Sequence, residues 1–333
     1  MRHGTNMSLD PFSDILKFTN AETVVSGGFS AGGAWALRFP APDKIKFFAL
    51  IKGGCWLMID GDDAPVRVEA GDVFLLSAQR TFILASDLSV EPVMATTLFS
   101  GAGRKFATLG DGADCIQIGG HVRLDPVTGN LLSDVLPSLI HVKASAPQAA
   151  VLKWLLDQMV QEGVADLPGS GLALSQIAQL MFVQLLRAHL SGPTPLAAGW
   201  LRALGDPRLA LALHLMHADP GRAWHLEELA SAVAMSRTTF ASRFKAVAGV
   251  PPLTYLLNWR MRLAQRALRE GGQPVAMLAL SLGYTSESAF SNAFKRAIGV
   301  APKRFRDAAR FAMSGRRGAT APVLQSSLEE LYS

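Results

Sequence analysis

Residues 279–306 read ALSLGYTSESAFSNAFKRAIGVAPKRFR, and this stretch decides the fold of the C-terminal half. Phe290 and Phe294 are four residues apart, so they lie on one face of a helix. Thr285 or Ser286, just before them, is a favourable helix N-cap, and Gly283 suits the left-handed position that ends a preceding helix. The stretch therefore predicts a short helix, a tight turn and a second, longer helix.

The same pattern occurs about fifty residues earlier in the chain, where residues 230–256 read ASAVAMSRTTFASRFKAVAGVPPLTYL. The identical pairs at an offset of fifty residues include Ser236 and Ser286, Phe240 and Phe290, Phe244 and Phe294, Lys245 and Lys295, Gly249 and Gly299, Val250 and Val300, and Pro252 and Pro302. A match of this length indicates a duplicated unit. Each copy has the organisation of a helix-turn-helix, over about residues 225–247 and 274–297.

An amphipathic stretch, residues 253–269, connects the two copies. Its apolar residues recur at helical spacing, and its four arginines are expected to remain largely exposed: Arg260, Arg262, Arg266 and Arg269. About 17 residues of helix span roughly 25 Å at 1.5 Å per residue. This length is enough to hold two recognition helices about one DNA turn (~34 Å) apart, so that one chain could enter two successive major grooves.

The second helix of each copy carries polar side chains opposite its phenylalanines. The side chains of the types that read base edges are Arg237, Thr238, Ser242, Arg243, Glu287, Ser288, Ser291 and Asn292. Basic groups and capping hydroxyls are better suited to phosphates, which position a protein without specifying a sequence. The candidates for phosphate contacts are Ser236, Lys245, Ser286, Lys295, Arg296, Lys303, Arg304 and Arg306.

Charge is distributed unevenly along the 333 residues. The whole chain carries a formal charge of +5, to which residues 1–195 contribute −4 and residues 196–333 contribute +9. Only the basic half is therefore expected to meet a polyanion such as DNA. Hydrophobic residues form 49% of the chain, which excludes a wholly disordered protein. The length of 333 residues suggests about two domains.

The N-terminal half begins as short β segments. Between residues 20 and 120, apolar runs such as 47–51, 55–59 and 73–76 are separated by turns that contain glycine and aspartate. Short strands at this spacing predict an antiparallel sandwich or barrel. From residue 145 the pattern becomes helical and predicts two apolar helices, which either cover the β-domain or pair with another subunit.

The predicted fold class is α+β in two domains, an N-terminal antiparallel β-barrel with helices followed by an all-α double helix-turn-helix. The first domain is expected at residues 8–191, and a linker rich in proline and glycine at 192–206. The DNA-binding domain is expected at 207–312, and a disordered tail at 313–333.

Residues 207–310 resemble the DNA-binding domain of the AraC/XylS family of bacterial transcription regulators. The pattern that carries the resemblance is Ala279-x3-Gly283-Tyr284-x5-Phe290-x3-Phe294-Lys295-Arg296-x2-Gly299-x2-Pro302-x2-Phe305-Arg306. It implies two helix-turn-helix units that bind double-stranded promoter DNA, usually as an activator that works with RNA polymerase. Residues 10–190 resemble, more loosely, the cupin-like sensor domains that precede this module in many members. That resemblance implies binding of a small effector, homodimerisation, or both.

Aromatic and cationic side chains of the N-terminal half are the candidates for an effector pocket. They are Trp35, Arg38, Lys46, Trp56, Phe74, Phe82 and His121. Alternating aromatic residues are equally what an ordinary core requires, and this alternative stays open. No histidine lies between His3 and His121, so the usual ligands of catalytic cupins are missing, and neither a metal nor another cofactor is expected.

The two cysteines, Cys55 and Cys115, exclude a disulfide scaffold and fit a reducing cytoplasm. They are interpreted as small core residues, with a redox pair as the alternative. The first residues show no signal peptide, and the apolar stretch 167–186 begins with proline and glycine. It therefore predicts a turn followed by a buried helix, and no membrane partner is expected.

These observations predict a cytoplasmic, sequence-specific DNA-binding regulator that is not an enzyme. Its N-terminal domain is expected to sense an effector, to dimerise, or both. Two alternatives stay open. One is a DNA-binding regulator without an effector, and the other is a metal-free cupin-type enzyme fused to a DNA-binding module.

Overall fold

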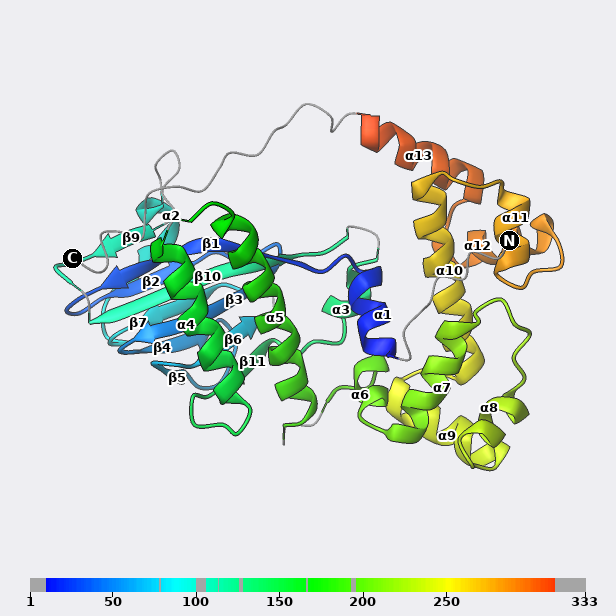
Figure 1. The fold of residues 1–333 in the computed structure, drawn as a ribbon, viewed down its shortest axis with the longest axis horizontal. Coiled ribbons are helices and arrows are strands. Elements are labelled where there is room, and N and C mark those ends of the chain that lie inside the picture. Colours follow the sequence, from blue (N-terminus) through cyan, green and yellow to red (C-terminus); the bar gives the residue numbers. More distant parts are fainter. Residues whose placement is uncertain are drawn as a thin grey trace. The chain divides into compact units, whose positions relative to one another are not determined.

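The computed structural model describes residues 10–77, 79–99, 106–112, 114–125, 128–165, 167–192 and 196–314. The chain divides into two compact units, one rich in β-strands and one helical. Figure 1 labels their elements. The predicted disordered tail lies outside the described residues from residue 315 onward.

The β-rich unit contains two sheets (Figure 1). In spatial order, the six-stranded sheet consists of β11 (Leu139–Val142), β6 (Val73–Leu76), β3 (Ile45–Lys52), β10 (Cys115–Arg123), β1 (Glu22–Ala31) and β9 (Phe106–Leu109). The five-stranded sheet consists of β5 (Val66–Glu69), β4 (Gly54–Ile59), β7 (Phe82–Ala85), β2 (Ala36–Phe39) and β8 (Val93–Met94). Most neighbours are antiparallel as predicted, but the edge strands β9 and β8 run parallel to β1 and β2. The sequence alternation could not reveal this difference, because both pairings have the same two-residue side-chain period.

One hydrophobic core lies between the two sheets. Phe29, Phe48 and Phe74 from the six-stranded sheet share a buried cluster with Leu57 and Phe82 from the five-stranded sheet. Successive side chains of a strand point to opposite faces of its sheet, so each strand contributes only every second side chain to this core. The cluster confirms the predicted packing of short strands into a sandwich or barrel.

The two predicted apolar helices of this half are α4 (Ala149–Ala165) and α5 (Ser170–Leu190). Helix α5 packs on β1, β6 and β11, and α4 packs on α5. Within the described ranges, α5 is the one helix long and apolar enough to cross a membrane, and 28% of its most apolar window is buried. Helix α5 covers the six-stranded sheet with one side, and it is less buried than the sequence predicts. The short helix α2 (Ala95–Leu98) lies near β2 and β8.

The helical unit contains both predicted helix-turn-helix motifs. Its helices are α1 (Pro11–Phe18), α3 (Asn130–Ser133), α6 (Trp200–Leu204), α7 (Pro207–Ala218), α8 (Leu226–Ala232), α9 (Arg237–Ala248), α10 (Pro252–Glu270), α11 (Val275–Ser281), α12 (Glu287–Ile298) and α13 (Pro302–Ser314). The first motif is α8 and α9, the second is α11 and α12, and α10 connects them.

The second helices of the two motifs begin at serine caps and end within one residue of the predicted bounds, 247 and 297. The hydroxyl of Ser236 accepts a hydrogen bond from the Thr239 amide at 3.2 Å, and that of Ser286 accepts one from the Ala289 amide at 3.1 Å. Both helices end at a glycine with a positive φ, +79° at Gly249 and +87° at Gly299. These caps satisfy backbone groups that a helix end leaves unpaired.

The tight turns of the two motifs have different residues at the left-handed position. Gly283 has φ +82°, and a Cβ atom there would lie 2.2 Å from the Gly221 carbonyl oxygen. Ala234, forty-nine residues earlier, occupies the matching turn with φ +52°. A left-handed conformation costs an L-residue about 1–2 kcal/mol, so the first motif has a strained turn that the second motif avoids.

The boundaries of the two units differ from the predicted domains. Helix α1 and the segment Asp125–Val135 belong to the helical unit, although the sequence places them within 8–191. The predicted linker, 192–206, contains α6. The physical reason is long-range packing of apolar residues such as Phe18, whose ring lies 4.9 Å from that of Trp259. Hydrophobic periodicity predicts a buried face but does not name its partner.

The arginines of α10 are less exposed than predicted, and all four are partly buried. The Arg260 guanidinium donates hydrogen bonds to the carbonyl oxygens of Pro220 and Arg222 at 2.6 and 2.8 Å. Arg269 forms an ion pair with Asp125. The amphipathic pattern of α10 hides these contacts, because they come from segments distant in the sequence.

Candidate nucleic-acid interface and sensor cavity

The phenylalanines of the repeat anchor both recognition helices, α9 and α12. Phe240, Phe244, Phe290 and Phe294 have no exposed surface. Within each helix the two rings lie 5.7 Å apart, in edge or tilted geometry. The opposite face of each helix is therefore fixed toward solvent.

The solvent-facing side of these helices presents the predicted base-edge candidates. Arg237, Thr238, Ser242, Arg243, Ser288 and Asn292 are exposed, and Glu287 and Ser291 are partly exposed. All eight side chains are accessible to solvent on their helices, and the major groove of DNA is wide enough to admit an α-helix.

Three of these candidates already have partners within the chain. Arg237 contacts Glu227 at 3.0 Å, and Arg243 contacts Asp206 at 2.6 Å. Glu287 lies 3.9 Å from the ammonium of Lys303. The pairs of Arg237 and Glu287 are exposed and contribute about 0–1 kcal/mol, so Arg237 can exchange its partner for DNA at small cost. The side chain of Asp206 is only 13% exposed, so the surface-pair magnitude does not apply to Arg243.

The phosphate candidates fall into three groups in the structure. Lys245, Lys295, Arg296, Lys303 and Arg304 are exposed. The hydroxyls of Ser236 and Ser286 cap their own helices, so they have already accepted one hydrogen bond each. Arg306 is only partly exposed, and its Nε atom is buried without a hydrogen-bond partner. It is therefore less available to phosphate than the other basic residues.

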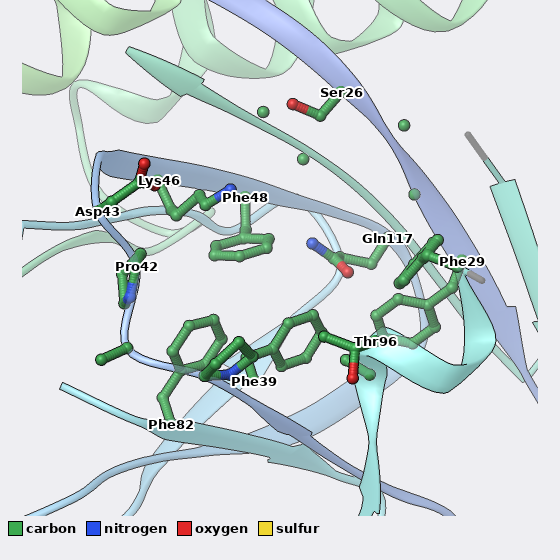
Figure 2. Close-up of a pocket in the computed structure, with 18 residues that line it drawn as sticks. Ser26, Phe29, Phe39, Pro42, Asp43, Lys46, Phe48, Phe82, Thr96 and Gln117 are labelled. Carbon is green, nitrogen blue, oxygen red and sulfur yellow. The ribbon is translucent and has the colours of Figure 1, made fainter. Parts of the chain in front are cut away.

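The β-rich unit contains a cavity of about 450 Å³. Its wall is largely aromatic and includes Phe29, Phe39, Phe48, Phe82 and Phe99. Polar groups that line it are the side chains of Ser26, Asp43, Lys46, Thr96 and Gln117. Figure 2 shows the Gln117 amide directed into the space bounded by these rings. Gln117 is buried, and its Nε2 donates to the Ile118 carbonyl oxygen at 3.2 Å.

Glycines bring the two strands behind this cavity close together. Gly28 on β1 and Gly119 and Gly120 on β10 line it. A Cβ atom at Gly28 would lie 2.1 Å from the Gln117 carbonyl oxygen. The β1–β10 pair is therefore a close-packed wall, with little room for larger side chains.

Two of the predicted pocket residues, Lys46 and Phe82, line the cavity. Burial lowers the pKa of Lys46, although it lies beside Asp43. His121 lies next to the cavity, because its Nδ1 is 2.8 Å from the hydroxyl of the lining residue Ser26. Burial and the nearby cations Lys44 and Lys46 lower the pKa of His121 to about 4, so its ring is neutral at pH 7.

The other predicted pocket residues lie outside the cavity lining. Trp35 and Phe74 are core residues, packed against Phe29 and Phe48. Trp56 is half-buried beneath the Arg67 guanidinium, 5.4 Å away. Arg38 is partly exposed on β2. Trp35 and Phe74 therefore follow the alternative given above, that aromatic residues of the strands form an ordinary core.

Sequence reasoning missed several lining residues, notably Phe39, Phe48 and Gln117. The signal that could have identified Phe48 is the alternation of side chains along a single strand. Lys46 and Phe48 are two apart on β3, as are Gln117 and Gly119 on β10, so each pair faces one side of its strand.

Cys55 and Cys115 are both free and buried in the core between the sheets. The contact with the Cys115 thiol and burial raise the pKa of Cys55, so this thiol stays protonated. Among the residues that the structure describes, no group of three or more His, Cys, Asp or Glu side chains is arranged to hold a metal ion. His141 instead contacts the buried carboxylate of Asp72 at 2.8 Å.

Both halves of the chain match known proteins. A cupin family matches residues 10–191, and a helix-turn-helix domain family matches residues 229–308. An AraC-like transcription regulator of Streptomyces antibioticus is 42% identical over 298 residues, 90% of this chain and 98% of the relative. The transcriptional regulator AlkR of Acinetobacter baylyi is 28% identical over 82% of this chain and 91% of the relative. The crystal structure of the DNA-binding domain of AdpA with a target DNA is 31% identical with a TM-score of 0.31, over 34% of this chain and 99% of that domain.

The cupin match alone covers more than half of the chain, and the Streptomyces antibioticus relative aligns over nearly its full length. The helix-turn-helix match contains both recognition helices described above. The chain therefore belongs to the AraC-like family of transcription regulators, with a cupin-like N-terminal domain and a DNA-binding helix-turn-helix domain.

Proposed function

We propose that one chain inserts α9 and α12 into two successive major grooves on the same side of a DNA duplex. The observation that carries this proposal is that the chain exposes the same kind of helix twice. Both helices have 12 residues, bury two phenylalanines and expose polar side chains, and a single helix connects their motifs. The 19 residues of α10 correspond to about 28 Å of helix, comparable to one DNA turn.

The exposed side chains divide into two roles in this proposal. Arg237, Thr238, Ser242 and Arg243 on α9, and Glu287, Ser288, Ser291 and Asn292 on α12, read base edges. The exposed lysines and arginines near the ends of both helices bind phosphates and fix the register. This division follows from donor geometry, because Asn and Arg can form paired hydrogen bonds with a base, whereas Lys acts as a point charge.

Selection of bound duplexes from a random DNA pool by the full chain tests this function. The expected result is a recurrent motif of two sequence blocks whose centres lie about 10–10.5 base pairs apart. Failure to enrich any sequence would contradict base reading by either helix.

We further propose that the cavity is the effector site and accepts a small apolar molecule with one anionic or acceptor group. A volume of about 450 Å³ with a mainly aromatic wall lies within the usual range of ligand pockets, about 300–1,000 Å³. Lys46 supplies the cation and Gln117 supplies an amide, and both line the cavity. The effector would act by binding one DNA-binding arrangement better than another.

The apolar anion 8-anilinonaphthalene-1-sulfonate is a probe of this chemistry. Replacing Lys46 with methionine is expected to raise its dissociation constant about tenfold, equivalent to about 1.4 kcal/mol, because one charge-assisted contact is lost. Fluorescence titration measures this change. Saturating probe is also expected to raise the melting temperature of the wild-type chain, as binding to the native state requires.

Lys44→Met is the matched control, because Lys44 is exposed, lies two residues away and does not line the cavity. Equal weakening in both variants would mean that the probe responds to overall charge. A probe that leaves the wild-type melting temperature unchanged would contradict a native binding site.

We propose that the chain forms a homodimer through α4 and α5. These helices pack together and expose large apolar side chains: Val151 and Trp154 on α4, and Leu172 and Leu180 on α5. Large apolar side chains exposed on two neighbouring helices favour a subunit contact. Sedimentation should show a dimer at micromolar concentration that Trp154→Glu weakens, and a wild-type chain that stays monomeric would exclude this interface.

The proposed regulator is cytoplasmic, is not an enzyme, and activates transcription with RNA polymerase at the promoter. The alternative of a regulator without an effector is favoured if no ligand changes its thermal stability. A promoter fusion assayed with and without the gene for this chain would decide between activation and repression.

A further inference from the structure

Two segments from the N-terminal half pack on the helical unit. They are α1 and Asp125–Val135. In sequence, α1 ends four residues before β1 starts at Glu22, and Asp125 comes two residues after β10 ends at Arg123. These two strands pair with each other and line the cavity.

The two segments are joined to each other before they reach α10. The Asp125 amide donates to the Thr19 carbonyl oxygen at 2.8 Å. The Thr128 hydroxyl lies 3.2 Å from the Phe18 carbonyl oxygen and 3.1 Å from Oδ1 of Asp125. They therefore form one structural piece, although more than one hundred residues separate them in the sequence.

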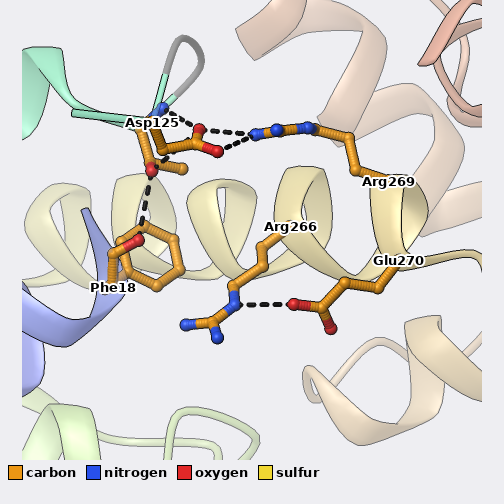
Figure 3. Close-up of polar contacts among 6 residues, drawn as sticks. Phe18, Asp125, Arg266, Arg269 and Glu270 are labelled. Carbon is orange, nitrogen blue, oxygen red and sulfur yellow. Dashed lines mark hydrogen bonds and ion pairs between the residues drawn. The ribbon is translucent and has the colours of Figure 1, made fainter. Parts of the chain in front are cut away.

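This piece contacts α10 at three positions along its length. The Phe18 ring lies 4.9 Å from the Trp259 ring, and the Arg266 guanidinium lies 5.8 Å from the centre of the Phe18 ring. Nη1 of Arg269 donates to both carboxylate oxygens of Asp125 at 2.5 Å. Figure 3 shows Phe18, Asp125, Arg266 and Arg269, with Arg266 also hydrogen-bonded to Glu270.

Helix α10 carries the two helix-turn-helix motifs on its two halves. In the first half, Tyr255 packs 5.8 Å from Phe244 of α9, and Trp259 stacks 4.0 Å from His217 of α7. In the second half, Ala264 and Leu268 lie in the buried cluster of the second motif, together with Phe290 and Phe294. The contacted residues Trp259 and Arg269 are ten positions apart, about 15 Å along the helix, on either side of the junction between the halves.

The same piece also reaches the first motif's supporting helices. Helix α1 packs on α6 and α7, and the indole of Trp200 on α6 donates to the Leu131 carbonyl oxygen at 2.6 Å. One piece is thus attached both to the scaffold of the first motif and to the far end of α10.

We propose that α1 and Asp125–Val135 form a splint that fixes α10 and so sets the spacing of the two recognition helices, with Asp125 and Arg269 as positioning residues for DNA binding. This inference rests on the proposed binding of two successive grooves. Binding at the second groove is effectively intramolecular once the first is occupied, and its strength depends on how closely the held spacing matches the DNA. Holding the two recognition helices rigidly also reduces the conformational entropy that the chain loses when it binds DNA.

The test compares full-length variants on two duplexes, one with both selected sequence blocks and one with a single block. Asp125→Asn removes the charge that holds Arg269 and keeps an oxygen for the Thr128 amide, which Oδ1 accepts at 3.0 Å. The splint predicts about fivefold weaker binding to the two-block duplex and unchanged binding to the single block. Simple electrostatics predicts the opposite, because removal of a carboxylate makes the chain more cationic.

Glu22→Gln is the matched control. It removes one carboxylate from an exposed ion pair, Glu22 with Arg123 at 2.7 Å, that does not reach α10. It should leave the preference for two blocks intact. Asp125→Glu keeps the charge and should retain most of the two-block affinity, and thermal melting confirms that each variant is folded.

The outcomes separate the splint from the proposed function. If wild-type protein binds both duplexes equally, two-groove binding is wrong and the splint falls with it. If wild-type protein prefers two blocks but Asp125→Asn binds them as tightly or more tightly, the splint alone is overturned. Equal weakening on both duplexes would also overturn it, because positioning affects only the second groove.

Discussion

Replacing Phe294 with alanine is expected to lower the free energy of unfolding of the helical unit by about 3–5 kcal/mol. Phe294 has no exposed surface, and its ring lies 5.7 Å from Phe290 and 5.6 Å from Phe305. Truncation leaves a cavity in the cluster that attaches α12 to α10 and α11. Folded proteins typically have a free energy of unfolding of only about 5–15 kcal/mol, so this substitution removes much of the stability of the helical unit.

Urea unfolding followed by far-ultraviolet circular dichroism measures this effect. Ser288→Ala, an exposed change on the same helix, serves as the control and should stay within about 0.5 kcal/mol of wild type. If Phe294→Ala unfolds at the wild-type urea concentration, the ring is not part of the core and the anchoring of α12 is wrong.

Replacing Asn292 with alanine is expected to weaken binding to the selected motif by about 1–3 kcal/mol, with the loss confined to particular base pairs. Asn292 is exposed on α12, and its amide can both donate to and accept from an adenine edge. Arg237→Ala on α9 should have a loss of similar size at a different position of the motif. Titration of a panel of single-base variants of the motif measures where each loss falls.

Lys295→Ala provides the contrast, because Lys295 is an exposed phosphate candidate three residues along the same helix. It should weaken binding to every duplex alike and reduce the slope of log affinity against log salt by about 0.9. A uniform loss for Asn292→Ala, without any change at a particular base pair, would show that this residue does not read sequence.

The helical unit could be predicted closely from the sequence because its signals are local. Ser286 and Gly299 mark the ends of one helix, and Phe290 and Phe294 mark its buried face, all within fourteen residues. Each of these signals depends on backbone groups or side chains within about one or two helical turns. The duplication then repeats them, so the two copies support the same interpretation.

The β-rich unit could be predicted only in outline, because its decisive contacts are distant in sequence. Phe74 and Phe82 read alike as strand aromatics, but only Phe82 lines the cavity. Strand alternation shows which side chains share a face and not whether that face meets a packed core or an open space. The same limit applies to Asp125 and Arg269, which are 144 residues apart and whose pairing no local pattern contains.

Hydroxyl-radical footprinting of the full chain on a selected duplex tests two-groove binding most directly. Two-groove binding predicts two protected regions for each bound chain, with centres about one helical turn apart on one face of the DNA. Phe294→Ala should remove only the region bound by α12. A single protected region for each wild-type chain, or two regions on opposite faces of the duplex, would contradict two-groove binding.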